Sequence, residues 1–441
     1  MHALRLGAAY AATLTLFSIH AQAQQSEAVA AEPAAPPKQT ATANALARDA
    51  YVRAVLAANP SVESARQAWR AARAREEQAG AFEDPMIQFG MAPLSIGSSM
   101  RFGFDIGISQ QLPWFGKRAL ERDVMTAEAA AAESDIESVR RELAMTAVSL
   151  YDRYYVAFRS LEINSQHVQL MQSMRTAAST QYEAGRGSAN DALQAEAELT
   201  QLERQAAVLE ADRDVLVAQM NELLHRDPSV PLSPPVDALV PAGSADVQDP
   251  KELEQAAIAR RPEITSARFR VRAEASKAEA AGRAYYPNIM LETSYSTMWD
   301  MPEHRWMVGV GVNIPLPTDA RSGAIDEAHA ARAQYEREIE RMSDMVKTQV
   351  YVATRRIRES EHVLLLFQTR LLPVAREQVS VAHAGFIASQ TAFMTVVQAE
   401  RNLRSVELEQ KMVEAEHAGR KAELDRALGR IPGLGAEEAQ P

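Results

Sequence analysis

Histidine is the side chain most often used for acid–base catalysis near neutral pH, and this chain scatters its nine histidines widely. No pair has the His-x-x-x-His spacing of a helical metal site, and no Gly-x-Ser-x-Gly elbow or glycine-rich phosphate loop with a lysine is present. Carboxylates are abundant, but they lie on long stretches where solvated helix faces explain them. The sequence therefore predicts no enzyme and no cofactor.

One short segment carries side chains that could bind a soft metal ion. Thioether sulfurs together with an imidazole suit copper or silver. The segment contains Met298, Asp300, Met301, Glu303, His304 and Met307. An exposed loop that happens to be rich in methionine explains the same pattern and is the favoured interpretation, which leaves Met298, Met301 and His304 as candidates only.

The first 23 residues have the pattern of an export signal. Arg5 precedes an apolar stretch, and Ala21-Gln22-Ala23 supplies the small residues that a signal peptidase requires. The stretch is too short to span about 30 Å of hydrocarbon. We expect cleavage after Ala23, followed by a disordered lead-in over residues 24–43 that is rich in alanine, proline, glutamate and glutamine.

Composition narrows the environments and partners that the mature chain could have. No later stretch reaches about 18 uninterrupted apolar residues, so strands must make any contact with a membrane interior. Cysteine is absent, which excludes disulfides, thiolate metal sites and lipid attachment at an N-terminal cysteine. The formal net charge of −11 argues against a nucleic acid partner and is compatible with the passage of cations.

The chain is internally duplicated. Residues of the first half recur 202 positions later, as Pro60, Arg66, Gly80 and Pro85 do in Pro262, Arg268, Gly282 and Pro287. A repeat of this length is half a molecule rather than a solenoid unit of about 20 to 50 residues. We expect repeats at 44–226 and 251–430, a proline-rich linker at 227–250 and a C-terminal tail at 431–441.

Each half contains very long tracts without glycine or proline. These tracts cover residues 119–184, 188–227, 324–372 and 386–428. A helix over the first tract would be about 99 Å long, far beyond a globular helix. Pro373 should kink the helix at the end of the third tract because its ring nitrogen cannot donate to the preceding turn.

Four leucines in the second tract fall seven residues apart, the spacing of a coiled-coil seam. They are Leu202, Leu209, Leu216 and Leu223. No basic region precedes them, so long antiparallel helices packed through a heptad seam are favoured over a DNA-binding zipper.

Between the long tracts, each half alternates apolar with polar or glycine residues at period two, which is typical of strands. We expect strands at about 86–94, 102–112, 288–297 and 305–315, each close to the length that crosses a bilayer. Four strands cannot close a barrel, and open edges are not tolerated in lipid, so the chain must pool strands with copies of itself. Three chains would give twelve strands. The expected lipid-facing residues are Phe104, Ile106, Ile108, Trp306, Val308, Val310 and Val312.

The ordered set of an export signal, duplicated helix-strand-strand-helix-helix halves and two short motifs resembles the TolC-type outer membrane factors. The motifs are Gln111-Leu112-Pro113-Trp114-Phe115-Gly116-Lys117-Arg118 and Tyr182-Glu183-Ala184-Gly185. The resemblance covers about 44–430, and the first motif looks most like the heavy-metal branch, the partners of cobalt-zinc-cadmium and copper pumps. It implies a mainly α protein with a membrane β segment, in which a trimeric 12-stranded β-barrel is continued by a long α-helical barrel and the linker forms an equatorial collar.

The resemblance also implies that two helix-turn-helix tips dock on a periplasmic adaptor protein and form the gate. The tip residues are Gly185, Arg186, Gly187, Ser188 and Asp191 in the first half, and Gly385, Phe386, Ser389, Thr395 and Gln398 in the second. The second tip is about four residues longer, and Thr395 and Gln398 stand where the family archetype has acids. Arg186 is either a docking contact or a helix-end cation. We expect positive φ at Gly185 and Gly385.

The resulting prediction is a passive homotrimeric exit duct in the bacterial outer membrane. The duct contacts the membrane lipid and reaches into the periplasm. Its expected partners are a periplasmic adaptor and an inner-membrane RND pump. Heavy-metal cations are the expected substrate, and multidrug efflux or type I secretion is the alternative. A periplasmic coiled-coil scaffold is the alternative of another class, and it would not need an all-apolar strand face.

Overall fold

The long tracts without glycine or proline form helices in the computed structural model, which describes residues 45–92, 103–236, 238–239, 250–299 and 301–434. The predicted signal peptide and lead-in lie outside the described residues. So do residues 93, 94 and 102 of the predicted strands, Asp300, and parts of the predicted linker and tail.

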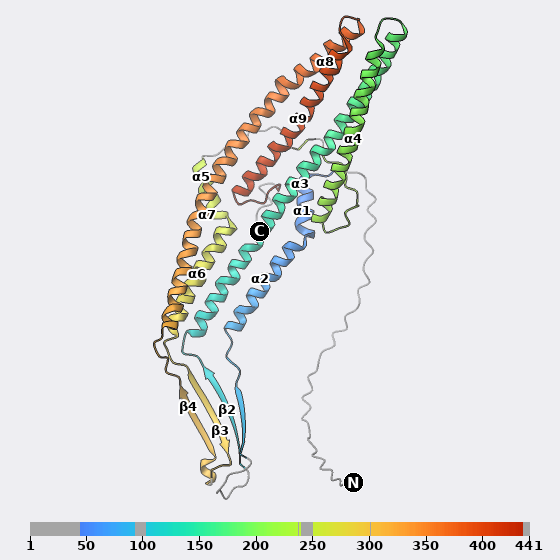
Figure 1. Cartoon of the computed structure of the whole chain (residues 1–441). Helices are drawn as coiled ribbons and strands as arrows, with labels where there is room; N and C mark the ends of the chain where they lie inside the picture. Colours follow the sequence, from blue (N-terminus) through green and yellow to red (C-terminus); the bar gives the residue numbers. More distant parts are fainter. Residues whose placement is uncertain (1–44, 93–102, 237, 240–249, 300, 435–441) are drawn as a thin grey trace, which may run out of the picture. The chain divides into compact units, whose positions relative to one another are not determined.

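The described chain is built mainly from long helices (Figure 1). The longest, α3, has 67 residues and is about 100 Å long. The long helices are α3 (Lys117–Glu183), α4 (Ala189–Leu223), α7 (Asp319–Leu366) and α9 (Phe393–Ala427). The shorter helices are α1 (Arg48–Ala58), α2 (Pro60–Ala79), α5 (Pro250–Arg260), α6 (Pro262–Arg283), α8 (Leu372–Ile387) and the 3-10 turn η1 (Pro302–His304).

The order of elements repeats with the sequence. A short helix, a second helix begun by a proline, two strands and a long helical hairpin follow one another in each half. Pro60 and Pro262 occupy the first helical position, where the missing N–H has no intrahelical partner to lose and the fixed φ suits the helix. The duplicated sequence therefore gives a duplicated arrangement of elements.

The four strands form one antiparallel sheet in the order β1 (Met86–Ala92), β2 (Gly103–Leu112), β3 (Ile289–Ser296) and β4 (Trp306–Val312). Three of them have seven or eight residues, which is shorter than predicted. Pro315 has no N–H to donate, so the regular ladder does not reach the end of the predicted fourth strand. At the other strand, Pro287 likewise has no N–H to donate, and β3 begins after it, at Ile289.

Cross-strand register places the apolar residues on one face of this sheet. Ile106 lies opposite Phe89 on one side and Tyr295 on the other, and Val310 lies opposite Leu291. Residues directly opposite one another share a face. The other face carries glycine and polar side chains, such as the Glu292 and Gly309 pair.

A tyrosine-rich core joins α1 to the middle of α3. Tyr51 and Tyr151 are fully buried with ring centroids 6.2 Å apart, and the Tyr51 hydroxyl donates to the Met220 carbonyl at 3.1 Å. The described chain starts beside the linker here, since the Leu46 amide donates to the Pro234 carbonyl at 2.7 Å. This packing fixes the level at which the linker crosses the long helices.

Pro373 does not break the third tract. A π-helical turn, η2 (Phe367–Leu371), ends two residues before Pro373, and α8 continues beyond the proline. A π turn is a common way for a helix to absorb an irregular hydrogen-bond ladder. In the predicted seam, Leu202 and Leu216 are buried, whereas Leu209 and Leu223 are half-buried. Over the described residues, none of the helices is both long and apolar enough to cross a membrane.

Candidate functional site

The first predicted tip is a tight turn between α3 and α4. Gly185 has φ +70°, as predicted, and the amides of Arg186 and Gly187 donate to the Gln181 carbonyl at 2.8 and 3.0 Å. Ser188 caps α4 in a capping box with Asp191, which satisfies otherwise free amides at the helix start. The exposed Gly185, Arg186 and Ser188 face solvent in this chain.

The second turn corrects the prediction for Gly385, which does not adopt positive φ. Gly385 lies within α8, and its carbonyl accepts from the amides of Gln390 and Thr391 at 2.8 and 3.2 Å. The left-handed residue is Ser389, with φ +56°. Gly385 is thus the counterpart of Gln181, and the turn comes four residues later than the shared Ala-Gly pattern suggested.

Gly385 is suited to its place for a different reason. A Cβ added there would collide with Thr391 Oγ1 and lie 3.0 Å from Thr391 Cβ. The glycine therefore permits the chain that leaves the turn, at Thr391, to pass close to the end of α8. The prediction was wrong because the two halves share the Ala-Gly pair in sequence but place it at different positions of the turn.

The two turns lie next to each other at the ends of the hairpins farthest from the strands (Figure 1). Gln181 Nε2 donates to the Phe386 carbonyl at 3.4 Å. Phe386 is buried against Phe393, with ring centroids 5.3 Å apart, so its ring packs between helices and is not offered to a partner. Thr395 and Gln398 are exposed along a groove between α8 and α9.

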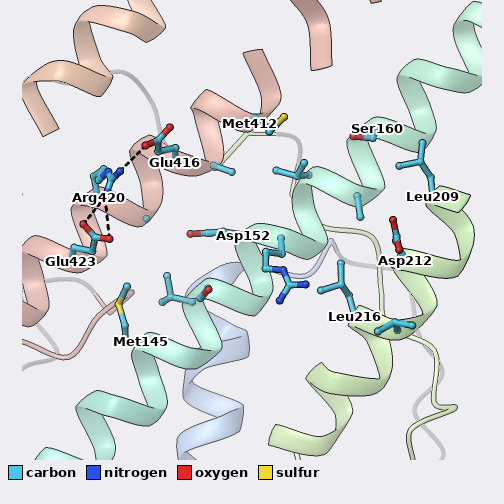
Figure 2. Close-up of a pocket in the computed structure, with 18 residues that line it drawn as sticks. Met145, Asp152, Ser160, Leu209, Asp212, Leu216, Met412, Glu416, Arg420 and Glu423 are labelled. Carbon is cyan, nitrogen blue, oxygen red and sulfur yellow. Dashed lines mark hydrogen bonds and ion pairs between the residues drawn. The ribbon is translucent and has the colours of Figure 1, made fainter. Parts of the chain in front are cut away.

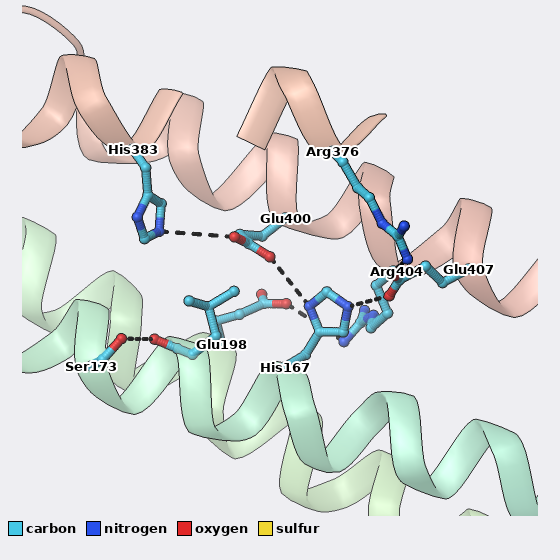
Figure 3. A network of polar contacts seen from close by, with 9 residues as sticks. His167, Ser173, Glu198, Arg376, His383, Glu400, Arg404 and Glu407 are labelled. Atoms are coloured by element: carbon cyan, nitrogen blue, oxygen red, sulfur yellow. Dashed lines mark hydrogen bonds and ion pairs between the residues drawn. The ribbon is translucent and has the colours of Figure 1, made fainter. Parts of the chain in front are cut away.

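A buried network of charged groups crosses from α3 to α8 and α9 behind these turns (Figure 3). His167 Nδ1 lies 3.3 Å from Glu400, and its Nε2 lies 3.2 Å from Glu407. His383 Nε2 is 3.9 Å from Glu400, and Arg376 is 3.5 Å from Glu407. Glu400 is only 3% exposed, so its charge depends on these cationic partners.

The two carboxylates keep His167 charged. Burial alone would lower its pKa, but the close contacts with the carboxylates of Glu400 and Glu407 raise the pKa of His167 to about 9. Burial acts to raise the pKa of Glu407, and its contact with His167 outweighs this and lowers it. The imidazolium therefore stabilises the contact between α3 and α9.

A second ion pair joins α4 to α9. Glu198 is buried and accepts from Arg401 at 2.5 and 2.9 Å, with Arg404 at 3.9 Å. The sequence did not predict either network, because the contacts that join α3 or α4 to α9 link residues more than 200 positions apart along the chain. The sequence offered one signal for them: a histidine and several glutamates occupy helix positions that would otherwise be expected to carry buried apolar residues.

A cavity of about 740 Å³ lies beside the middle of α3, between α3, α4 and α9 (Figure 2). Its acids are largely engaged: Asp152 pairs with Arg48 at 3.3 Å, and Arg420 with Glu416 and Glu423 at 2.7 and 3.1 Å. Burial raises the pKa of Asp152 to about 6, against the opposing charge of Arg48. The cavity is therefore a charged recess in the helical wall.

The predicted lipid-facing residues share the apolar face of the sheet. Val308 is 85% exposed in the single chain, and Ile106, Ile108, Trp306, Val310 and Val312 are exposed as well, with Phe104 half-buried. An exposed apolar face of this extent is unusual for a protein surface in water. It is the surface of this chain that most needs a covering.

The candidate metal loop exposes its methionines in this chain. Met298 and Met301 are largely exposed, and the His304 ring meets Trp299 edge-on with centroids 6.5 Å apart. Within the described ranges, which omit Asp300, no three or more His, Asp or Glu side chains are placed to hold a metal ion.

Comparison with known proteins identifies the family. The model of a family described as outer membrane efflux protein matches residues 51–224 and 253–430, which is most of the chain. The chain belongs to the outer membrane efflux protein family. This membership confirms the predicted outer membrane location, with the helices reaching into the periplasm, and the prediction that the chain is not an enzyme.

Two curated relatives are similar over parts of their length. The fusaric acid resistance protein FusA of Burkholderia cepacia is 27% identical over 263 residues, which cover 55% of this chain and 48% of FusA. The outer membrane efflux protein BepC of Brucella suis biovar 1 is 26% identical over 318 residues, which cover 65% of this chain and 64% of BepC. The matches thus span about half to under two thirds of these relatives.

Solved channel structures have the same fold. CusC superposes with a TM-score of 0.74 at 16% identity, covering 87% of this chain and 92% of CusC. VceC of Vibrio cholerae superposes with a TM-score of 0.73 at 15% identity, covering 87% of this chain and 96% of VceC. The resemblance to TolC-type factors and the predicted fold class are confirmed.

Proposed function

We propose that the protein is a passive exit duct through the outer membrane. The observation that carries this proposal is the exposed apolar face of the four-stranded sheet, at the opposite end of the long helices from the two turns (Figure 1). A protein that only bridges partners in the periplasm has no use for such a face. Lipid covers it without leaving apolar surface in water.

The sheet has two free edges, β1 and β4, in the described chain. Unpaired strand edges are costly in hydrocarbon, so copies of the chain must supply the missing neighbours. Three chains supply twelve strands, an even number that is common for outer membrane barrels. The long helices of the same three chains then continue the wall into the periplasm.

The energy for transport comes from elsewhere in this proposal. The chain has no glycine-rich loop with a lysine to bind a nucleotide phosphate. An inner-membrane RND pump supplies the energy, and a periplasmic adaptor docks on the exposed residues of the turns, Gly185, Arg186, Ser188, Ser389, Thr395 and Gln398 among them.

Heavy-metal cations are the substrate class that we propose first, on the resemblance of residues 111–118 to the metal branch. The net charge of −11 does not repel cations at long range. Organic toxins are the second candidate, because the relative FusA is named for resistance to fusaric acid. Selectivity resides in the pump in both cases, since an open duct lacks the closed ligand shell of a metal site.

Two experiments test this function. The full chain should run as a heat-modifiable trimer in outer membrane fractions, and a periplasmic monomer would refute the duct. Ser188→Cys or Ala388→Cys should crosslink to an adaptor, since the chain has no other cysteine. Crosslinks confined to a cysteine at Pro234 in the collar would refute docking at the turns.

The substrate needs a separate test. A deletion strain should become sensitive to zinc, cadmium, cobalt or copper ions. Sensitivity to fusaric acid and drugs alone would transfer the function to organic toxins. The triple variant Met298→Ala, Met301→Ala and His304→Ala should keep resistance nearly intact, and loss of copper resistance would make that loop a functional site.

A further inference from the structure

Aromatic and cationic side chains gather where the strands give way to helices. The four strand–helix connections lie at one level, at the ends of α2, α3, α6 and α7 (Figure 1). We call the aromatic, aliphatic and cationic side chains at these connections the junction band. The same connections also contain the acids Glu83, Asp84 and Asp319. The band consists of Phe82, Trp114, Phe115, Lys117, Arg118, Arg283, Tyr286, Ile314, Leu316 and Arg321.

Three of the aromatic members pack together, with Trp114 half-buried and the others exposed. Trp114 stacks on Tyr286 with ring centroids 6.0 Å apart and meets Phe115 edge-on at 6.0 Å. Phe115 is 80% exposed, and Phe82 is more than half exposed. These rings follow directly on the apolar face of the sheet, whose last paired residues include Leu112 and Ile289. Rings in this position are typical of the boundary between hydrocarbon and headgroups.

The cations of the band are held by neutral groups. Lys117 Nζ donates to the Tyr286 carbonyl and to Asn288 Oδ1, both at 2.7 Å. Arg283 donates to the Phe115 carbonyl at 3.1 Å, and Arg321 donates to the Leu316 carbonyl. Backbone carbonyls orient these side chains without neutralising them, and Glu121 is the carboxylate whose charge acts on Lys117.

Arg118 shows the same arrangement. Its guanidinium lies over the Phe82 ring, 3.5 Å from the centroid, and donates to the Gly80 carbonyl. In the part of the chain that the structure describes, none of Lys117, Arg118, Arg283 and Arg321 lies within 4.0 Å of a carboxylate. On the helices, in contrast, many arginines pair with glutamates.

We propose that the junction band binds the headgroups of anionic phospholipids in the membrane leaflet that faces the helices. The band has the two parts that this ligand requires: rings at the depth of the glycerol backbone, and preoriented cations one step farther from the hydrocarbon for the phosphate. The inference rests on the proposed function, because it takes the sheet as the membrane segment.

Native mass spectrometry of the detergent-purified full-length trimer tests the inference, with phosphatidylglycerol and phosphatidylcholine as probes. The wild type should retain phosphatidylglycerol in preference. The double variant Arg118→Gln and Arg321→Gln should bind it about 30-fold more weakly, which follows from about 1 kcal/mol for each cation near a lipid surface. The lysine pair Arg118→Lys and Arg321→Lys keeps both charges and should keep the preference.

The matched control is the double variant Arg355→Gln and Arg356→Gln. Both arginines are exposed on α7, so this variant removes the same amount of charge at a place away from the sheet. It should bind lipid as the wild type does. The inference is overturned if the glutamine pair at the junction binds phosphatidylglycerol normally, or if the wild type shows no preference over phosphatidylcholine.

Two further outcomes separate this inference from the proposed function. If trimers form in the outer membrane but show no lipid preference, only the lipid site fails. If no trimer forms even for the wild type, the duct and the lipid site both fail. If the double variant Arg118→Gln and Arg321→Gln lowers the trimer yield while the amount of bound lipid is unchanged, the band belongs to the contact between subunits, and a lipid site is refuted.

Discussion

Replacing His167 by glutamine should destabilise the helical region in a manner that depends on pH. His167 lies between Glu400 and Glu407, at 3.3 and 3.2 Å, and its pKa is raised from 6.5 to about 9. A shift of this size corresponds to about 3 kcal/mol of folding free energy. Since the pKa is raised in the folded state, this contribution is complete below about pH 6.5 and is lost as the pH rises through about 9.

The expected change in melting temperature follows from the size of the chain. The roughly 370 residues that the structure describes give an unfolding entropy of roughly 0.8 kcal/mol/K, so a loss of about 3 kcal/mol lowers the midpoint by about 4 °C. The assay is thermal unfolding of the detergent-solubilised protein, followed by helical circular dichroism between pH 6 and 10. Wild type and His167→Gln should differ by about 4 °C at pH 6 and converge above pH 9.

The other charged groups that face His167 are Glu400 and Glu407, which also contact His383 and Arg376. The comparison therefore measures the loss of His167 together with the response of this network. His362→Gln, at an exposed position on α7, is the matched control and should not move the midpoint at any pH. A difference that stays constant from pH 6 to 10 would refute the ion pair and leave only packing as the cause.

Three further changes test other parts of the structure. Gly385→Ala should destabilise the second turn because its Cβ meets Thr391, and adding Thr391→Gly should restore the melting temperature; no rescue would refute the steric account. Val310→Arg places a charge on the apolar face at a cost of about 2 to 4 kcal/mol, so it should lower trimer yield in the outer membrane far more than Gly309→Ser, and equal yields would sink the facing assignment. Ser188→Ala removes the cap of α4 and should speed amide exchange in its first turn, consistent with a loss of about 1 kcal/mol, whereas unchanged exchange would mean the cap is dispensable.

Patterns with a fixed period could be predicted from the sequence. Alternation at period two located all four strands, and the absence of glycine and proline located the long helices to within a few residues at most ends. Where the strand ranges were too long, as at Pro315, the pattern of side chains continued after the hydrogen-bond ladder had stopped. Periodicity records which face is apolar, not where pairing ends.

The charged contacts could not be predicted in this way. His167 reaches Glu400 only after α3 and α9 have packed, and no local pattern records that neighbour. The junction band could be predicted only in part: residues 111–118 resemble a family motif, whereas only the structure shows that Lys117 and Arg118 are hydrogen-bonded to residues of other connections at the end of the sheet. Contacts between residues far apart in the chain depend on how the helices and strands pack. The local pattern of a single sequence does not record that packing.

The duplicated halves also differ where a partner would meet them. The first turn uses a glycine for its left-handed residue and a serine cap, whereas the second places Ser389 at φ +56° and has Ala392 at the cap without a side-chain bond. A non-glycine residue in this conformation and an uncapped helix start each cost local stability. In the proposed trimer, three firm turns therefore alternate with three softer ones. An adaptor would meet a surface of threefold rather than sixfold symmetry, so one adaptor subunit cannot make the same contacts with both turns.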